Sequence, residues 1–214
     1  MKKIKKFLFG TILAAVCAFS ACGGITTNAA ETATTPVVVN SFENQSDLNY
    51  VMMQQLLGKI TLQEEKEYIT DGDASMKVWV QPNLFGDVAQ YDARVPAFMH
   101  TLNLKKAGKN YTSFRNVASV KIDVYNAETT EQQIGVNLAY KEVNRGFQTG
   151  RATFYTLAPE AWTTVTMEIT SLSIPQAYNK KAVAIGFVFD RPTSKETAGR
   201  TFYVDNFRLE MKES

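Results

Sequence analysis

The stretch FYVDNFRLEM, residues 202–211, carries both the clearest fold signal and the main anomaly of this chain. Apolar and polar residues alternate in it, as a strand with one buried face requires. Asp205 and Asn206 nevertheless lie side by side at its centre, although both residue types are depleted in strands. The alternation predicts that Phe207 and Leu209 face a core, and the two polar residues need a separate explanation.

Short segments of the same kind recur along the chain, with turn residues between them. They predict ten strands, over residues 37–42, 59–70, 75–81, 97–104, 119–125, 134–140, 151–157, 162–169, 182–190 and 201–209. One segment, DLNYVMMQQLLG at 47–58, has a spacing of apolar residues that favours a helix. Many short strands without alternating helices predict an all-β fold, a two-sheet antiparallel β-sandwich.

The N-terminal stretch MKKIKKFLFGTILAAVCAFSAC is typical of a bacterial lipoprotein leader. Lysines precede an apolar run of signal-peptide length, and FSAC resembles a lipobox. We expect residues 1–21 to be a signal peptide, Cys22 to carry lipid, 22–36 to be a flexible tether and 37–214 to be one domain. The alternative is a simple signal peptide that is cut elsewhere. The lipid anchor would place the domain at the cell membrane, on its extracytoplasmic side, with no other membrane contact.

Charge and composition exclude several function classes. The chain has 23 basic and 21 acidic residues; removal of the four leader lysines leaves 19 against 21, a net charge of −2. A nucleic-acid binder needs concentrated positive charge, so no nucleic-acid partner is expected. His100 is the only histidine, and both cysteines lie in the first 22 residues. This excludes most histidine-containing catalytic triads and most zinc sites. We therefore expect no enzyme, although a glycan hydrolase needs only two carboxylates and stays open.

Four stretches together resemble the galactose-binding-like jelly rolls, the fold of many carbohydrate-binding modules. They are SFE at 41–43, DGDASMKVWV at 71–80, VASVKIDVYN at 117–126 and YVDNFRL at 203–209. The resemblance implies a structural calcium ion where the first and last strands meet, and calcium takes about six to eight oxygen ligands. The matching acids are Glu43 and Asp205, and the loop before 75–81 would supply backbone carbonyls near Asp71, Gly72 and Asp73. The alternative is that Asp205 accepts backbone hydrogen bonds and that DGD is only a turn.

The same resemblance places the strands at 97–104, 134–140, 151–157 and 182–190 in one sheet. Strand alternation then predicts an outer face with a floor of small residues and polar or aromatic side chains around it. Sugar recognition combines an aromatic ring with groups that pair with hydroxyls. The candidate glycan contacts are Tyr91, Arg94, Asn137, Lys141, Arg151 and Tyr155; the alternative is that these are ordinary surface residues.

The sequence thus predicts a lipid-anchored domain that binds polysaccharide or oligosaccharide without cleaving it. The alternative function is a structural or protein-interaction module of the cell envelope that uses the same sandwich without a sugar site.

Overall fold

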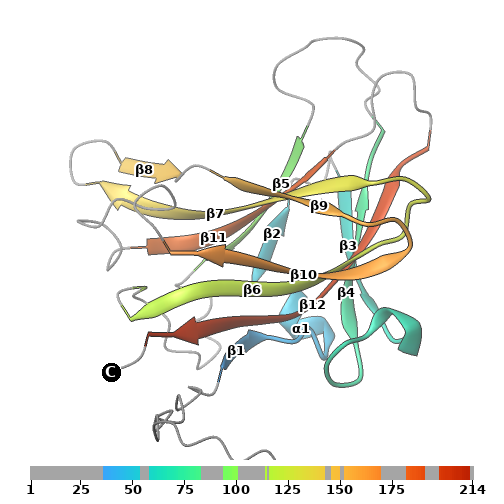
Figure 1. The fold of residues 1–214 in the computed structure, drawn as a ribbon, viewed down its shortest axis with the longest axis horizontal. Helices are drawn as coiled ribbons and strands as arrows, with labels where there is room; N and C mark the ends of the chain where they lie inside the picture. Colours follow the sequence, from blue (N-terminus) through green and yellow to red (C-terminus); the bar gives the residue numbers. More distant parts are fainter. Residues whose placement is uncertain are drawn as a thin grey trace, which may run out of the picture. The chain divides into compact units, whose positions relative to one another are not determined.

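The structure, a computed structural model, describes residues 36–53, 58–82, 94–100, 114, 116–142, 146–149, 152–169, 182–190 and 198–212. Within these ranges the chain forms twelve strands, one short α-helix and one 3-10 helix. The strands form two antiparallel sheets that lie one over the other (Figure 1). The predicted two-sheet sandwich is confirmed.

The first sheet is built around the last strand of the chain. Strand β12 (Arg200–Met211) pairs with β1 (Val37–Asn40), β4 (Ser75–Val80) and β6 (Val117–Asn126). The order is β10-β6-β12-β4-β3, with β1 on β12. The two outer strands are β10 (Ala161–Glu168) and β3 (Gly58–Gln63). We call this the β12 sheet.

The second sheet, which we call the β7 sheet, has the order β2-β5-β11-β7-β8, and β9 also pairs with β7. Its strands are β2 (Val51–Met53), β5 (Arg94–His100), β7 (Gln132–Glu142), β8 (Gly146–Thr149), β9 (Thr153–Leu157) and β11 (Ala182–Asp190). Strands β5, β7, β9 and β11 correspond to the four segments that the sequence placed in one sheet, and that grouping is confirmed. Strand β8 was not predicted.

The core lies between the two sheets, where the inner rows of both meet. Phe187 of β11 packs edge-on against Phe207 of β12 at 5.7 Å between ring centroids, and Phe189 packs on Phe202 at 5.3 Å. All four rings are fully buried. Burying one such side chain contributes about 1.5–3 kcal/mol, so these cross-sheet pairs account for much of the attachment between the layers.

The helix expected over 47–58 is wrong. The structure has a four-residue helix α1 (Gln45–Leu48), capped by the side chain of Asn44, and then strand β2; residues 54–57 lie outside the described ranges. Val51 is buried and Met52 is 53% exposed, which is a strand alternation. The predicted strand over 59–70 also ends early, at Gln63, before the 3-10 helix η1 (Lys66–Tyr68). No helix among the described residues has the length and apolarity to cross a membrane.

A β-bulge explains the adjacent acid and amide in β12. The register between β12 and β6 shifts between Asp205 and Arg208, so the bulged strand has one extra residue. Asn206 has φ 46°, in the left-handed region that Asn tolerates better than most residues. The extra residue shifts the alternation by one position, so that the inward row continues from Val204 to Phe207. Phe207 and Leu209 both face the core as predicted.

Candidate functional site

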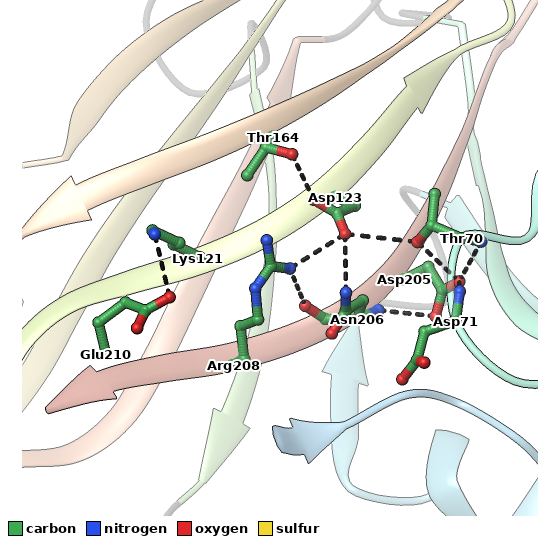
Figure 2. Close-up of polar contacts among 9 residues, drawn as sticks. All are labelled: Thr70, Asp71, Lys121, Asp123, Thr164, Asp205, Asn206, Arg208 and Glu210. Carbon is green, nitrogen blue, oxygen red and sulfur yellow. Dashed lines mark hydrogen bonds and ion pairs between the residues drawn. The ribbon is translucent and has the colours of Figure 1, made fainter. Parts of the chain in front are cut away.

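The loop of residues 70–73, between η1 and β4, meets the bulge of β12. The buried carboxylate of Asp205 accepts hydrogen bonds from the backbone N–H groups of Thr70 (2.7 Å) and Asp71 (2.9 Å) and from the Thr70 hydroxyl (3.0 Å), all at Oδ2. Its Oδ1 accepts from the N–H of Asn206 at 2.6 Å. Burial raises the pKa of the Asp205 carboxyl, and these hydrogen bonds act in the opposite direction. Figure 2 shows these contacts.

Glu43 holds the other end of the same loop. Its Oε2 accepts a hydrogen bond from the backbone N–H of Asp73 at 2.7 Å. Gly72 lies beneath this carboxylate: a Cβ on Gly72 would come within 2.0 Å of Glu43 Oε1, and its φ of 73° favours glycine. Glu43 and Asp205 therefore bind the same four-residue loop, although they lie at opposite ends of the domain sequence.

The four predicted calcium ligands do not form a cation site as they are placed. The loop directs backbone N–H groups at the two carboxylates, and donors of this kind pair with anions rather than with cations. The side chains of Asp71 and Asp73 are exposed, and Asp205 already accepts four hydrogen bonds, about the capacity of a carboxylate. Among the described residues, no group of three or more acids, histidines or cysteines could hold a metal ion. Calcium stays a prediction that this geometry does not fit.

A second polar network covers the outer face of the β12 sheet beside the bulge. Asp123 on β6 accepts from the Thr164 hydroxyl at 2.6 Å and from Asn206 Nδ2 at 3.0 Å. It also forms an ion pair with the guanidinium of Arg208 at 3.0 Å (Figure 2). The Thr70 hydroxyl lies 3.4 Å from the same carboxylate. Asp123 thus connects three strands and the 70–73 loop through contacts within the chain.

Aromatic rings continue the outer face of the β12 sheet. The ring of Tyr68, in η1, stacks on Tyr203 of β12 with centroids 3.9 Å apart and an interplanar angle of 6°. Tyr125 packs edge-on against Tyr68, Tyr203 and Trp162, and the Trp162 Nε1 donates to the carbonyl of Glu67. These rings contact one another and η1, so this part of the face is already occupied by the chain itself.

The outer face of the β7 sheet is built differently. Its central rows pair Ala184 with Ala139 and Gly186 with Asn137 across β11 and β7. These four residues are all buried, and Asn137 is 7% exposed. The floor of small residues that the sequence predicted is therefore present, with Asn137 in it. Because these residues are buried, a ligand at the described part of this face would contact the side chains around the floor rather than the floor itself.

The predicted alternation of β9 is wrong. Tyr155 pairs with Ile134 and packs against the core, and its hydroxyl donates to the Thr166 carbonyl of the opposite sheet at 2.6 Å. Phe154 faces outward instead and is 36% exposed. Its ring lies against Gly135, where an added Cβ would come within 2.7 Å of it. Two adjacent aromatic residues made the alternation ambiguous. The hydrogen bond from the Tyr155 hydroxyl to the Thr166 carbonyl is made on the inner side of the sheet.

Other predicted glycan contacts fall where no side chain is described. Tyr91 and Arg151 lie outside the described residues. Arg94 is the first residue of β5, and Lys141 lies near the end of β7. Register places Arg94 opposite Asp190 and Lys141 opposite Phe147. All four positions stay predictions as sugar contacts.

A polar pocket of about 360 Å³ lies where β7 begins and β9 and β11 end. Its lining includes Gln133, Thr156 and Asp190 of the β7 sheet, together with Glu131 and Arg200. Gln133 pairs with Thr156 in the row next to Gly135 and Phe154, about 7 Å further along the strands. This pocket and Phe154 were not predicted from the sequence, because residues from four strands and a turn meet there.

Comparison with known proteins gives a fold but no close relative. The sequence matches no family model and no curated protein. It is similar in structure to a family 11 carbohydrate-binding module from Clostridium thermocellum, described in complex with a β-1,3-1,4-mixed-linked tetrasaccharide (TM-score 0.52, 12% identity, 83% of this chain and 96% of that one). It is also similar to the CBM22-1 xylan-binding domain from Paenibacillus barcinonensis (TM-score 0.51, 12% identity, 85% and 99%).

Larger enzymes contain a similar fold. An exo-β-agarase matches with a TM-score of 0.53 and 9% identity over 83% of this chain, but over only 26% of the agarase chain. A Clostridium thermocellum endo-1,4-β-D-xylanase, with CBM22-1 and GH10 modules and xylohexaose, matches over 29% of its own length. The protein thus has the jelly-roll fold of carbohydrate-binding modules. It resembles family 11 and family 22 modules in architecture, at identities that speak for the fold alone.

Proposed function

We propose that this protein binds a polysaccharide or oligosaccharide without cleaving it, through the outer face of the β7 sheet. The observation that carries the proposal is the exposed Phe154 ring next to the polar pocket lined by Gln133, Thr156 and Asp190. The structurally similar modules support it, because two of them are described as bound to or named for a glycan.

The chemistry of this end of the sheet suits a sugar chain. An aromatic ring can stack on the apolar C–H face of a pyranose, while amide, hydroxyl and carboxylate groups pair with its hydroxyls. Gln133 and Thr156 both donate and accept, Asp190 accepts, and Arg200 donates. Binding would place one sugar ring against Phe154 and the next toward the pocket, since both lie on the same strands.

Anchoring completes the proposal. Removal of residues 1–21 and lipidation of Cys22 would leave 22–36 as a tether between the cell membrane and the domain. The domain would then hold a glycan close to the cell surface. Radiolabelled palmitate should be incorporated into the protein in bacterial cells, and Cys22→Ser should abolish the label while Cys17→Ser leaves it unchanged.

The direct test is affinity gel electrophoresis of the purified protein. The gels should contain mixed-linkage β-glucan, xylan, agarose and a set of other plant, algal and host polysaccharides, each compared with a polymer-free gel. Retardation by at least one polysaccharide, without release of soluble sugar on long incubation, is the expected result. Absence of retardation throughout the set favours the structural or protein-interaction module, and release of oligosaccharides favours a hydrolase.

A further inference from the structure

We propose that the seam between the first and last strands of this domain is closed by hydrogen bonds and that the domain folds without a calcium ion there. The resemblance to calcium-carrying jelly rolls implies an ion at this position, held by Glu43 and Asp205. The contacts of the 70–73 loop point to a different solution. The inference concerns the opposite sheet from the glycan-binding face and is independent of the proposed function.

The first step concerns the capacity of Asp205. A carboxylate has about four lone-pair positions, and Asp205 accepts from three N–H groups and one hydroxyl at 2.6–3.0 Å. Hydrogen bonds from N–H groups to an ionised carboxylate are about twice as strong as neutral ones. A cation at the same oxygens would displace these donors and would face their positive ends. The four donors therefore take the place that an ion would need.

The second step concerns the loop itself. Three of its four residues direct backbone N–H groups at the two carboxylates: Thr70 and Asp71 toward Asp205, and Asp73 toward Glu43. A calcium site of the implied kind needs carbonyl oxygens from this loop instead. Gly72, with φ 73°, permits the turn that gives the loop this orientation.

The third step concerns Oε1 of Glu43, a buried carboxylate oxygen without a hydrogen bond. It is therefore a carboxylate oxygen at the seam that could still bind a cation. Asp71 and Asp73 were predicted to supply backbone carbonyls, and their exposed side chains add no ligand at the seam. Calcium takes about six to eight oxygens, so about five to seven more would have to come from other groups. Glu43 acts here through Oε2, as the acceptor for Asp73.

Thermal unfolding and metal analysis test the inference on the whole purified protein. After dialysis against a chelator, elemental analysis should find calcium well below one equivalent, and added Ca²⁺ should leave the melting temperature unchanged. If calcium did bind at the seam, a free Ca²⁺ concentration of about a thousand times the dissociation constant would raise the melting temperature by roughly 8–16 °C. A rise of that size that is lost in Glu43→Gln overturns the inference. A rise that persists in Glu43→Gln comes from another part of the protein and leaves the seam ion-free.

A matched pair of neutralising substitutions provides the second measurement. Glu43→Gln keeps one acceptor for Asp73 and directs its NH₂ to the side without a partner, so the melting temperature should fall by less than about 2 °C. Asp205→Asn places an NH₂ donor against N–H donors, so hydrogen bonds are lost. The melting temperature should therefore fall by roughly 5–10 °C in the presence of chelator. Equal losses in the two variants that appear only when calcium is present overturn the inference.

Thr70→Val covers the case in which Asp205→Asn fails to fold. It removes one hydroxyl donor and keeps the backbone N–H, so it should lower the melting temperature by about 2–4 °C with and without Ca²⁺. Asp71→Ala and Asp73→Ala serve as controls, because only their backbone N–H groups contact the carboxylates. Unchanged stability in both controls shows that these two carboxylates bind no ion, and a calcium-dependent loss in either contradicts the inference.

Discussion

The two sheets of this sandwich have outer faces of opposite character. On the β12 sheet, Asp123 accepts from donors on two neighbouring strands and on the 70–73 loop, and Tyr203 stacks under Tyr68. On the β7 sheet, the centre of the face consists of small residues such as Ala139 and Ala184. The first face carries more of the residue types that usually mark a binding site, yet its polar groups and rings already contact one another. The small residues of the second face are buried themselves, so a ligand there would contact the side chains around them.

The two faces also share one device, which makes them directly comparable. Phe154 on the β7 sheet and Trp79 on the β12 sheet are exposed to similar extents, 36% and 40%. Each ring lies against a glycine, Gly135 and Gly199 respectively. An aromatic ring over a glycine in or next to a strand is by itself a way to protect the backbone. What distinguishes Phe154 is the polar pocket next to it.

The largest effect is expected for Asp123→Ala on the β12 sheet. The guanidinium of Arg208 is nearly buried, and the substitution removes the carboxylate that pairs with it. This loss should cost about 3–5 kcal/mol of unfolding free energy. Chemical denaturation measures the loss. Lys121→Ala is the control, since its ion pair with Glu210 is more exposed and should cost less than about 1 kcal/mol. Equal losses would mean that the network is less important than its geometry indicates.

The next effect is expected for Gly199→Ala. Its Cβ would come within 2.4 Å of Trp79 Nε1 and 2.7 Å of the backbone oxygen of Val80, which cannot move away easily. We expect a loss of about 1–3 kcal/mol by chemical denaturation, with glycan affinity unchanged. A fully stable Gly199→Ala would show that Trp79 is not held against the backbone.

The comparison of the two aromatic residues is sharpest in Phe154→Ala and Trp79→Ala. Loss of a stacking ring at a sugar site should weaken affinity about tenfold, roughly 1.4 kcal/mol, for Phe154→Ala only. Affinity gels containing the retarding polysaccharide, or titration calorimetry, measure it at matched folded protein. A loss of affinity confined to Trp79→Ala would move the binding face to the β12 sheet. Affinity unchanged from the unsubstituted protein in both variants would exclude both rings.

The smallest effect is expected for Tyr155→Phe. It removes the hydroxyl that donates to the Thr166 carbonyl, so stability should fall by about 1 kcal/mol while glycan affinity stays the same. Thermal unfolding and the same affinity gels measure the two quantities. A loss of affinity without a loss of stability would return Tyr155 to the glycan face, where the sequence had placed it.

Much of the fold could be predicted because each buried row repeats every two residues. The alternation in SVKIDVY and AVAIGFVFD predicted the inner rows that meet in the core, including Phe187 and Phe189. It failed where neighbouring residues were similar, as with Phe154 and Tyr155, and where a strand was very short, as with β2. In both cases the choice depended on a partner from a distant part of the chain.

Less of the candidate site could be predicted. Asn137 was predicted beside the floor of the β7 sheet and lies buried within it, and Gln133, Thr156 and Arg200 were not proposed. The pocket forms from the ends of strands that are far apart in the sequence, and alternation within one strand says nothing about its neighbours' ends. The role of Asp205 was also left open, because an aspartate that binds calcium and one that binds amides look alike in a sequence.

By itself, the sequence determined the sandwich, its inner rows and the need for a special arrangement at Asp205 and Asn206. These are properties of local alternation and of residue conformational preference, which act within a few residues. Tertiary structure alone decided that the 70–73 loop turns its N–H groups toward Glu43 and Asp205, and which aromatic ring of β9 faces outward. Those outcomes depend on which groups meet across the two sheets, and that is set only when the distant strands pack.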